Sequence, residues 1–304
     1  MHIPNGMLQG TICPVTAVIS TVGIGLAAFK AFFSEHKPAA GKFAAITALI
    51  FAGQMMNFPI NGGTSGHLLG GVMAAALLGI PFGVLSMALV VTIQCLVFSD
   101  GGSMALGANV LNMAIIGAGF GGIVQAYFKR FQSNSSYQAL GLGISAWLAV
   151  MMAALACSVE LSLSGVIPFF KVTGAMLSTH AFIGIGEGLI TAVVCFVLSS
   201  ELVNNSQKKS VTVPLVTSSI IATILSPFAS GLPDGLEWVA EKFNFFRESA
   251  PTFVNPLPGY TVPVISNEII TTSLTGLAGI VITFLCAWLM IGLLSRPASI
   301  LERN

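Results

Sequence analysis

The chain has 304 residues, of which 55% are hydrophobic and 8% are charged, and its mean hydropathy is +0.90. This composition excludes an ordinary soluble domain and predicts an integral membrane protein, with the lipid bilayer as its surroundings. Twelve basic residues stand against eleven acidic ones, and a net charge so close to zero gives no indication of a nucleic-acid-binding surface.

The hydrophobic runs predict an all-α polytopic bundle of about nine transmembrane helices, since a spanning helix needs about 20 apolar residues. In chain order, we place the spans at 12–33, 41–57, 65–80, 82–98, 105–128, 138–157, 174–199, 211–229 and 269–294. The third would rise only about 24 Å, short of the hydrocarbon core of about 30 Å. We therefore expect that segment to be tilted or recessed from one face.

Basic residues mark alternate loops of this arrangement. They lie between the first two spans and after the fifth, seventh and ninth, at Lys30, Lys37, Lys42, Lys129, Arg130, Lys208, Lys209, Arg296 and Arg303. Because cytoplasmic loops are enriched in Lys and Arg, the pattern predicts an amino terminus outside the cell and a carboxyl terminus in the cytoplasm.

The first residues, MHIPNG, place an α-amine and an imidazole side by side. The amine of Met1, the deprotonated amide nitrogen of His2 and Nδ1 of His2 close two chelate rings in one plane. On the predicted outer face, the segment NFPINGGTSGHL is typical of a shaped loop that brings His67 to the start of the third span. A nitrogen of His67 would complete a square, which favours Ni²⁺ or Cu²⁺, with Co²⁺ able to follow, over tetrahedral Zn²⁺.

Polar residues of the same loop are candidates to orient the two imidazoles by hydrogen bonds. They are Asn57, Asn61, Thr64 and Ser65. The alternative interpretation stays open: His2 is then a solvated terminal side chain, and His67 only caps or packs against a helix.

His180 and Glu187 lie seven residues apart in the seventh predicted span. This spacing puts them on one helix face, about 10 Å apart along the axis. An ionisable residue near the middle of the membrane is a functional candidate, and three roles compete for Glu187: a polar relay for the ion, a structural hydrogen bond between helices, or a contact with a transport partner. We favour structure or coupling over direct metal ligation.

Three motifs together resemble the CbiM/NikM family, the metal-specific substrate-binding (S) components of energy-coupling-factor (ECF) transporters for cobalt and nickel. They are MHIPNG, MNFPINGGTSGHLLGG at 56–71 and HAFIGIGEGLIT at 180–191. The resemblance implies a metal-binding domain at 1–205, with Met1, His2 and His67 as ligands, in a multi-pass protein of the prokaryotic inner membrane. One departure is Asn5, at a position often acidic in the family, which bears on a charge-assisted contact near the site and not on the ligand set.

A second resemblance lies between the last two spans. LPDGLEWVAEKF at 232–243 is similar to the PDGLE segment of a small auxiliary component (NikN-like, akin to CbiN), which implies a fused two-helix domain at 206–304 with an extracytoplasmic loop. The residues themselves predict a capping box between Asp234 and Glu237. They also predict an apolar face at the outer membrane surface, made of Leu236, Trp238, Val239 and Phe243. In the family such a loop assists metal loading; a passive linker is the alternative.

No phosphate-binding loop accompanies these motifs. The only Gly-Lys pair, Gly41-Lys42, has His36 where GxxxxGK[ST] requires the first glycine. The chain is therefore predicted not to be an enzyme, and the resemblance implies two partners, a CbiQ-like membrane coupling (T) subunit and CbiO-like ATPase subunits.

A rival hypothesis is a stand-alone secondary divalent-metal permease or channel. It needs a polar path, for which the spans offer only His180, Glu187, Gln54 and Gln94. The choice between Co²⁺ and Ni²⁺ as the transported substrate stays open, although the nitrogen square and the PDGLE segment both favour nickel.

Overall fold

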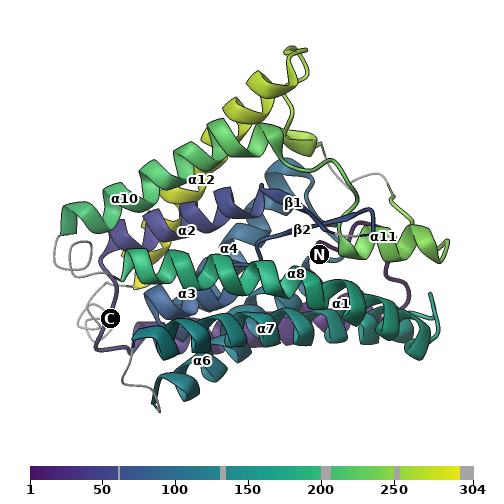
Figure 1. The fold of residues 1–304 in the computed structure, drawn as a ribbon, viewed down its shortest axis with the longest axis horizontal. Helices are drawn as coiled ribbons and strands as arrows, with labels where there is room; N and C mark the ends of the chain where they lie inside the picture. The colour runs from purple at the N-terminus through teal and green to yellow at the C-terminus, as the bar shows by residue number, and fades with distance from the viewer. Residues whose placement is uncertain (61, 131–134, 200–206, 250–253, 295–304) are drawn as a thin grey trace, which may run out of the picture.

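The computed structural model describes residues 1–60, 62–130, 135–199, 207–249 and 254–294. It is a bundle of long helices with one two-stranded sheet near the amino terminus (Figure 1). The elements are α1 (Ile12–Phe32), α2 (Ala40–Gln54), β1 (Asn57–Ile60), β2 (Thr64–His67), α3 (Gly71–Leu78), α4 (Ile80–Phe98), α5 (Leu106–Val110), the π-helix η1 (Leu111–Phe120), α6 (Gly121–Arg130), α7 (Ser135–Leu163), α8 (Phe169–Leu198), α10 (Gln207–Ile220), η2 (Ile221–Leu225), η3 (Ser226–Phe228), α11 (Gly235–Lys242), η4 (Pro258–Tyr260) and α12 (Glu268–Leu294).

Seven helical segments of the described chain are long and apolar enough to cross a membrane. They are Ile12–Phe32, Ile80–Phe98, Leu106–Arg130, Ser136–Leu163, Phe169–Leu198, Lys208–Phe228 and Glu268–Leu294. Helix α2 has 15 residues and rises only about 22 Å. The expected count of about nine spanning helices is therefore not confirmed.

The predicted third span, 65–80, differs most from expectation. β1 and β2 form an antiparallel hairpin in which Asn57 faces His67, and the turn contains Gly62 and Gly63, both with positive φ as tight hairpins require. Helix α3 has eight residues and rises about 12 Å. The fold is mostly helical, as expected, with this short hairpin as its sheet, and His67 ends a strand instead of beginning a helix.

Three buried residues without regular structure, 68–70, join β2 to α3. Inside a membrane protein such backbone is tolerated only where its polar groups find partners. The two carboxylate oxygens of Glu187 accept hydrogen bonds from the amides of Leu69 (2.6 Å) and Gly70 (2.8 Å), and Nε2 of Gln54 donates to the Leu69 carbonyl (2.6 Å). Helices α8 and α2 therefore fix the depth at which α3 begins.

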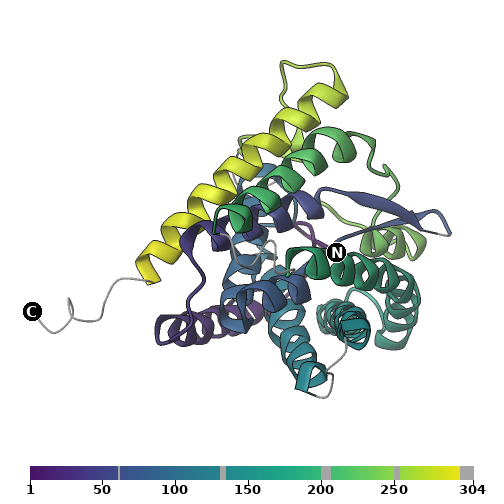
Figure 2. The same ribbon diagram turned by 60° about the vertical axis from the view of Figure 1, so that its left-hand side comes forward.

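The last third of the chain packs onto the first two thirds. Helices α10 and α12 lie along α2, as both views show (Figures 1 and 2), and α11 contacts α8 and β2. Leu236 and Val239 of α11 are fully buried. These two residues of the apolar face expected at the membrane surface are therefore turned toward the protein, because α11 covers the end of the hairpin, while Trp238 and Phe243 are half-buried.

Candidate metal centre

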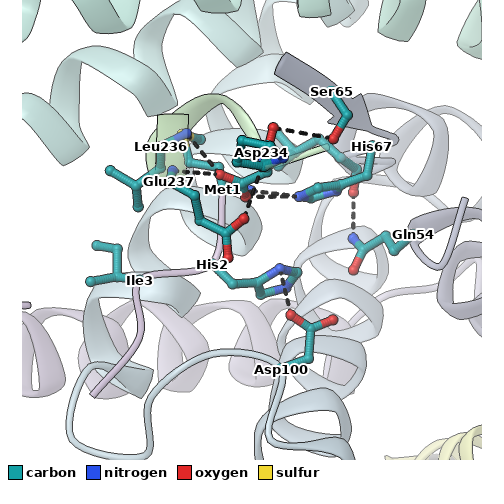
Figure 3. Close-up of polar contacts among 12 residues, drawn as sticks. Met1, His2, Ile3, Gln54, Ser65, His67, Asp100, Asp234, Leu236 and Glu237 are labelled. Atoms are coloured by element: carbon teal, nitrogen blue, oxygen red, sulfur yellow. Dashed lines mark hydrogen bonds and ion pairs between the residues drawn. The ribbon is translucent and has the colours of Figure 1, made fainter. Parts of the chain in front are cut away.

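The amino terminus is buried and meets His67. The nitrogen of Met1 lies 2.5 Å from Nε2 of His67 (Figure 3). Nδ1 of His67 lies 3.0 Å from the carbonyl oxygen of Leu68, and a carbonyl only accepts, so Nδ1 carries the proton. Nε2 therefore presents its lone pair toward the amine.

His67 is electrostatically prepared to stay neutral. Burial lowers its pKa below the ordinary 6.5, and the nearby positive amine and His2 lower the pKa further. Metals bind neutral imidazole. At neutral pH His67 is thus in the protonation state that a metal needs.

His2 is buried and stacks on His67, with ring centroids 5.2 Å apart and planes 19° apart. Its Nδ1 lies 3.2 Å from Oδ1 of Asp100, and its Nε2 lies 3.2 Å from the side-chain oxygen Oε1 of Gln94. The expected chelate uses Nδ1, so the ring must turn away from Asp100 before that nitrogen can bind a metal. In the absence of a cation, Nδ1 of His2 points to the carboxylate of Asp100 because an ionised carboxylate is the strongest hydrogen-bond acceptor within its reach.

Asn109 fixes the chain just after His2. Its side chain accepts from the Ile3 amide (2.8 Å) and donates to the Ile3 carbonyl (3.1 Å). Asn5 lies further along, where its side-chain oxygen accepts from the amide of Met104 at 3.1 Å. Asn5 thus ties the terminal segment to the loop after α4 and does not reach the nitrogen cluster.

Asp234 joins this cluster from the far end of the sequence. Its Oδ2 lies 2.7 Å from the Met1 nitrogen and 4.0 Å from Nε2 of His67. Its Oδ1 accepts from the amides of Leu236 (2.7 Å) and Glu237 (2.9 Å), while Glu237 accepts from the Asp234 amide (3.0 Å). The predicted capping box is confirmed, but sequence reasoning missed the ion pair that the second carboxylate oxygen makes.

The charge on Asp234 is held by its neighbours. Burial alone raises the pKa of the carboxyl group, but the amine of Met1, then His67 and the hydrogen bonds outweigh it and bring the pKa below the ordinary 3.8. A sequence signal for this pairing is hard to find, because the two residues are 233 positions apart.

The hairpin itself brings Asp234 into place. The amide of Ser65 donates to the Pro233 carbonyl (2.9 Å), its hydroxyl donates to the Leu232 carbonyl (2.8 Å), and Thr64 donates to Pro233 (3.1 Å). The carbonyl of Asn57 accepts from the amide of Ser230. Thr64 and Ser65 therefore bind the 230–234 segment, where we expected them to orient imidazoles, and Asn61 lies outside the described residues.

His180 and Glu187 are not part of the nitrogen cluster. Nδ1 of His180 donates to the carbonyl of Met176 at 2.8 Å. Its ring lines a small cavity that Met1, His67 and Asp234 also line, and a Cβ on Gly235 would lie only 2.9 Å from the ring. His180 is therefore a neighbour of the cluster, whereas both oxygens of Glu187 are occupied by backbone amides.

Nowhere in the described ranges do three His, Cys, Asp or Glu side chains gather as a metal site. A cation at this centre would depend on main-chain nitrogens in addition to the two imidazoles. The sequence analysis predicted this use of the Met1 amine and the His2 amide nitrogen as ligands.

Comparison with known families identifies two regions. Residues 2–201 match the model of the CbiM family, "Cobalt uptake substrate-specific transmembrane region". Residues 208–296 match the PDGLE domain.

One relative matches nearly the whole chain, and others match about two thirds of it. A protein of Archaeoglobus fulgidus that bears the provisional name of fused nickel transport protein NikMN is 36% identical over 291 residues, which are 93% of this chain and 95% of the relative. A Haloquadratum walsbyi protein, provisionally named a metal transport protein, is 39% identical over 198 residues, 63% of this chain and 87% of its own. The crystal structure of a transition metal transporter superposes with a TM-score of 0.59 at 30% identity, covering 68% of this chain and 99% of the solved one.

Proposed function

Because the chain belongs to the CbiM family of cobalt uptake proteins, a group of cobalt and nickel transport components, we propose that it captures Ni²⁺ or Co²⁺ at the outer membrane face as the substrate-specific component of an ATP-driven ECF transporter. Residues 1–205 form the metal-binding domain, and residues 206–304 form the fused PDGLE domain. The coupling subunit is CbiQ-like and the ATPase subunits are CbiO-like.

The observation that carries the proposal is the contact between the Met1 nitrogen and Nε2 of His67. Metal–nitrogen bonds of about 2.0 Å at right angles place adjacent ligands about 2.8 Å apart. The two nitrogens are therefore already spaced much like neighbouring corners of a square. Once its ring has turned from Asp100, His2 supplies the remaining two corners through its amide nitrogen and Nδ1.

The outer location of this centre is supported by charge placement. Nine of the twelve basic residues lie in the alternate loops predicted to be cytoplasmic, whereas the hairpin carries none and the loop with α11 carries two, Lys242 and Arg247. Under the positive-inside rule the Met1 end then faces outward.

Uptake of ⁶³Ni²⁺ into cells tests the proposal. We expect uptake only when this chain is expressed with coupling and ATPase subunits, and loss of uptake when one residue is added before Met1. An extra residue at the carboxyl end is the matched control, since it leaves the amine unchanged. Uptake by this chain alone would instead support a secondary permease, and full uptake by the extended protein would contradict the amine as a ligand.

A further inference from the structure

A chamber of about 280 Å³ lies beside the nitrogen cluster. Both parts of the chain build it: Gln54, His67 and Asp100 from the first part, and Asp234, Glu237 and Tyr260 from the second. Asp100 is 25% exposed, so its carboxylate is within reach of solvent.

The chamber adjoins the nitrogen cluster directly, because His2 and His67 line it together with carboxylates such as that of Asp100. Asp100 is held in place from two sides, by Nδ1 of His2 at 3.2 Å and by the hydroxyl of Tyr260, which donates to Oδ2 at 2.7 Å. Tyr260 stacks on Phe98, with ring centroids 4.6 Å apart. The carboxylate position is therefore built by the fold.

Gln54 supplies an independent sign that something polar belongs in the chamber. Its side chain is 4% exposed, and its Nε2 donates to the Leu69 carbonyl. Its Oε1 has no hydrogen-bond donor among the described residues, and Figure 3 shows this oxygen turned toward His2 and Asp100. A buried oxygen without a partner costs about 1–3 kcal/mol, which water molecules of a bound ion would recover.

The size and the ligand arrangement indicate how such an ion is held. Six water molecules occupy about 180 Å³ at about 30 Å³ each, so the chamber has room for a hydrated divalent ion. Carboxylates and imidazoles do not converge there for direct coordination within the described chain. Contacts through the water shell are therefore the form of binding that fits.

We propose that this chamber is a second cation site, in which a hydrated divalent metal ion is held through its waters by Asp100 and Gln54 before it moves to the nitrogen cluster. The identity of the ion as cargo rests on the proposed function. Waters of the ion donate to Asp100 in competition with Nδ1 of His2, so occupation of the chamber frees the His2 ring to turn. The fused domain contributes by supplying Tyr260, Asp234 and Glu237 to the walls.

Mn²⁺ is the probe, because it prefers carboxylate, carbonyl and water ligands over imidazole. Free Mn²⁺ is measured by EPR during titration of the purified full chain. We expect one Mn²⁺ per chain, with binding weakened about tenfold in Asp100→Asn, since one charge within a few ångströms contributes an energy of that order. Glu241→Gln removes an exposed carboxylate of α11 outside the chamber and serves as the matched control with unchanged Mn²⁺ binding.

Asp100→Asn keeps a side-chain oxygen that can accept from the hydroxyl of Tyr260. Gln54→Leu is a second variant, and it leaves every carboxylate of the chamber intact. The proposed second cation site would be contradicted if the unsubstituted protein did not bind Mn²⁺. It would also be contradicted if Asp100→Asn and Gln54→Leu both bound Mn²⁺ as the unsubstituted protein does. Calorimetry with Ni²⁺ on His67→Ala reports separately on the proposed function: retained Ni²⁺ affinity contradicts the nitrogen site, whatever Mn²⁺ does.

Discussion

The nitrogen of Met1 and the carboxylate of Asp234 form an ion pair at 2.7 Å. The pair joins the first residue of the chain to the residue that caps α11. Because Asp234 also lies 4.0 Å from Nε2 of His67, the fused domain is in direct contact with the proposed metal ligands. The 230–234 segment is held there by the hairpin, so metal capture and docking of α11 involve the same residues.

Asp234→Asn is expected to destabilise the metal-free protein by about 3 kcal/mol, the usual loss when one partner of a buried ion pair is removed. Asn is as good an N-cap as Asp, so the change isolates the charge opposite the amine. Thermal unfolding with and without Ni²⁺ measures this loss of stability. The loss should be smaller in the metal-bound form, because there the metal replaces the proton of the amine. Glu241→Gln is the control; equal unfolding temperatures of the two variants would contradict an energetic role for the pair.

His67→Ala is expected to abolish Ni²⁺ and Co²⁺ binding in calorimetry, since it removes one corner of the square. His36→Ala is the control, since it removes an exposed imidazole between α1 and α2. It should bind both metals as the unsubstituted protein does. Similar affinities for the two variants would show that His67 is no ligand.

Stability of the metal-free protein should fall toward acid from about pH 6.5. Burial lowers the pKa of both His2 and His67 below 6.5, so below that pH the unfolded chain binds more protons than the folded one. Each histidine then lowers the free energy of unfolding by at most about 1.4 kcal/mol per pH unit. Asp234, with a pKa below 3.8, contributes stability above that pH that is lost only in stronger acid.

Unfolding temperatures between pH 7.5 and 5 measure this slope, and it should become shallower in His67→Ala. An unchanged slope in that variant would mean that other groups carry the pH dependence.

Glu187→Gln is expected to lower the unfolding temperature and the abundance of the protein. A glutamine side chain offers one acceptor oxygen, so one of the amides of Leu69 and Gly70 loses its partner, at a cost of about 1–3 kcal/mol. Thr191→Ser, a mild change one turn further along α8, is the control. Normal abundance and metal binding together with lost uptake would instead assign Glu187 to coupling.

Orientation can be tested by cysteine labelling in a background without the native cysteines. Glu35→Cys and Asn267→Cys lie at exposed positions beside α1 and α12. A membrane-impermeant maleimide added to intact cells should label position 267 and not position 35. The reverse pattern would place the nitrogen cluster on the cytoplasmic side.

Several predictions from the sequence are confirmed. The CbiM and PDGLE resemblances are matched by the family models, and the capping box of Asp234 and Glu237 is present. Long hydrophobic runs such as 269–294 agree with helices to within a few residues. The prediction of a helix at 65–80 was wrong, because periodicity and hydropathy cannot distinguish a full helix from a strand followed by a half-helix.

The sequence by itself determined the membrane class, the long helices and the helix cap, because each depends on residues close together in the chain: a continuous apolar run must satisfy its own backbone in lipid, and a cap acts over three positions. Tertiary structure decided the rest. Glu187 supports residues 69 and 70 from another helix, Asp100 holds Nδ1 of His2, and Asp234 reaches the amine of Met1. These contacts join residues that are tens to hundreds of positions apart, and only the packing of the helices brings them together.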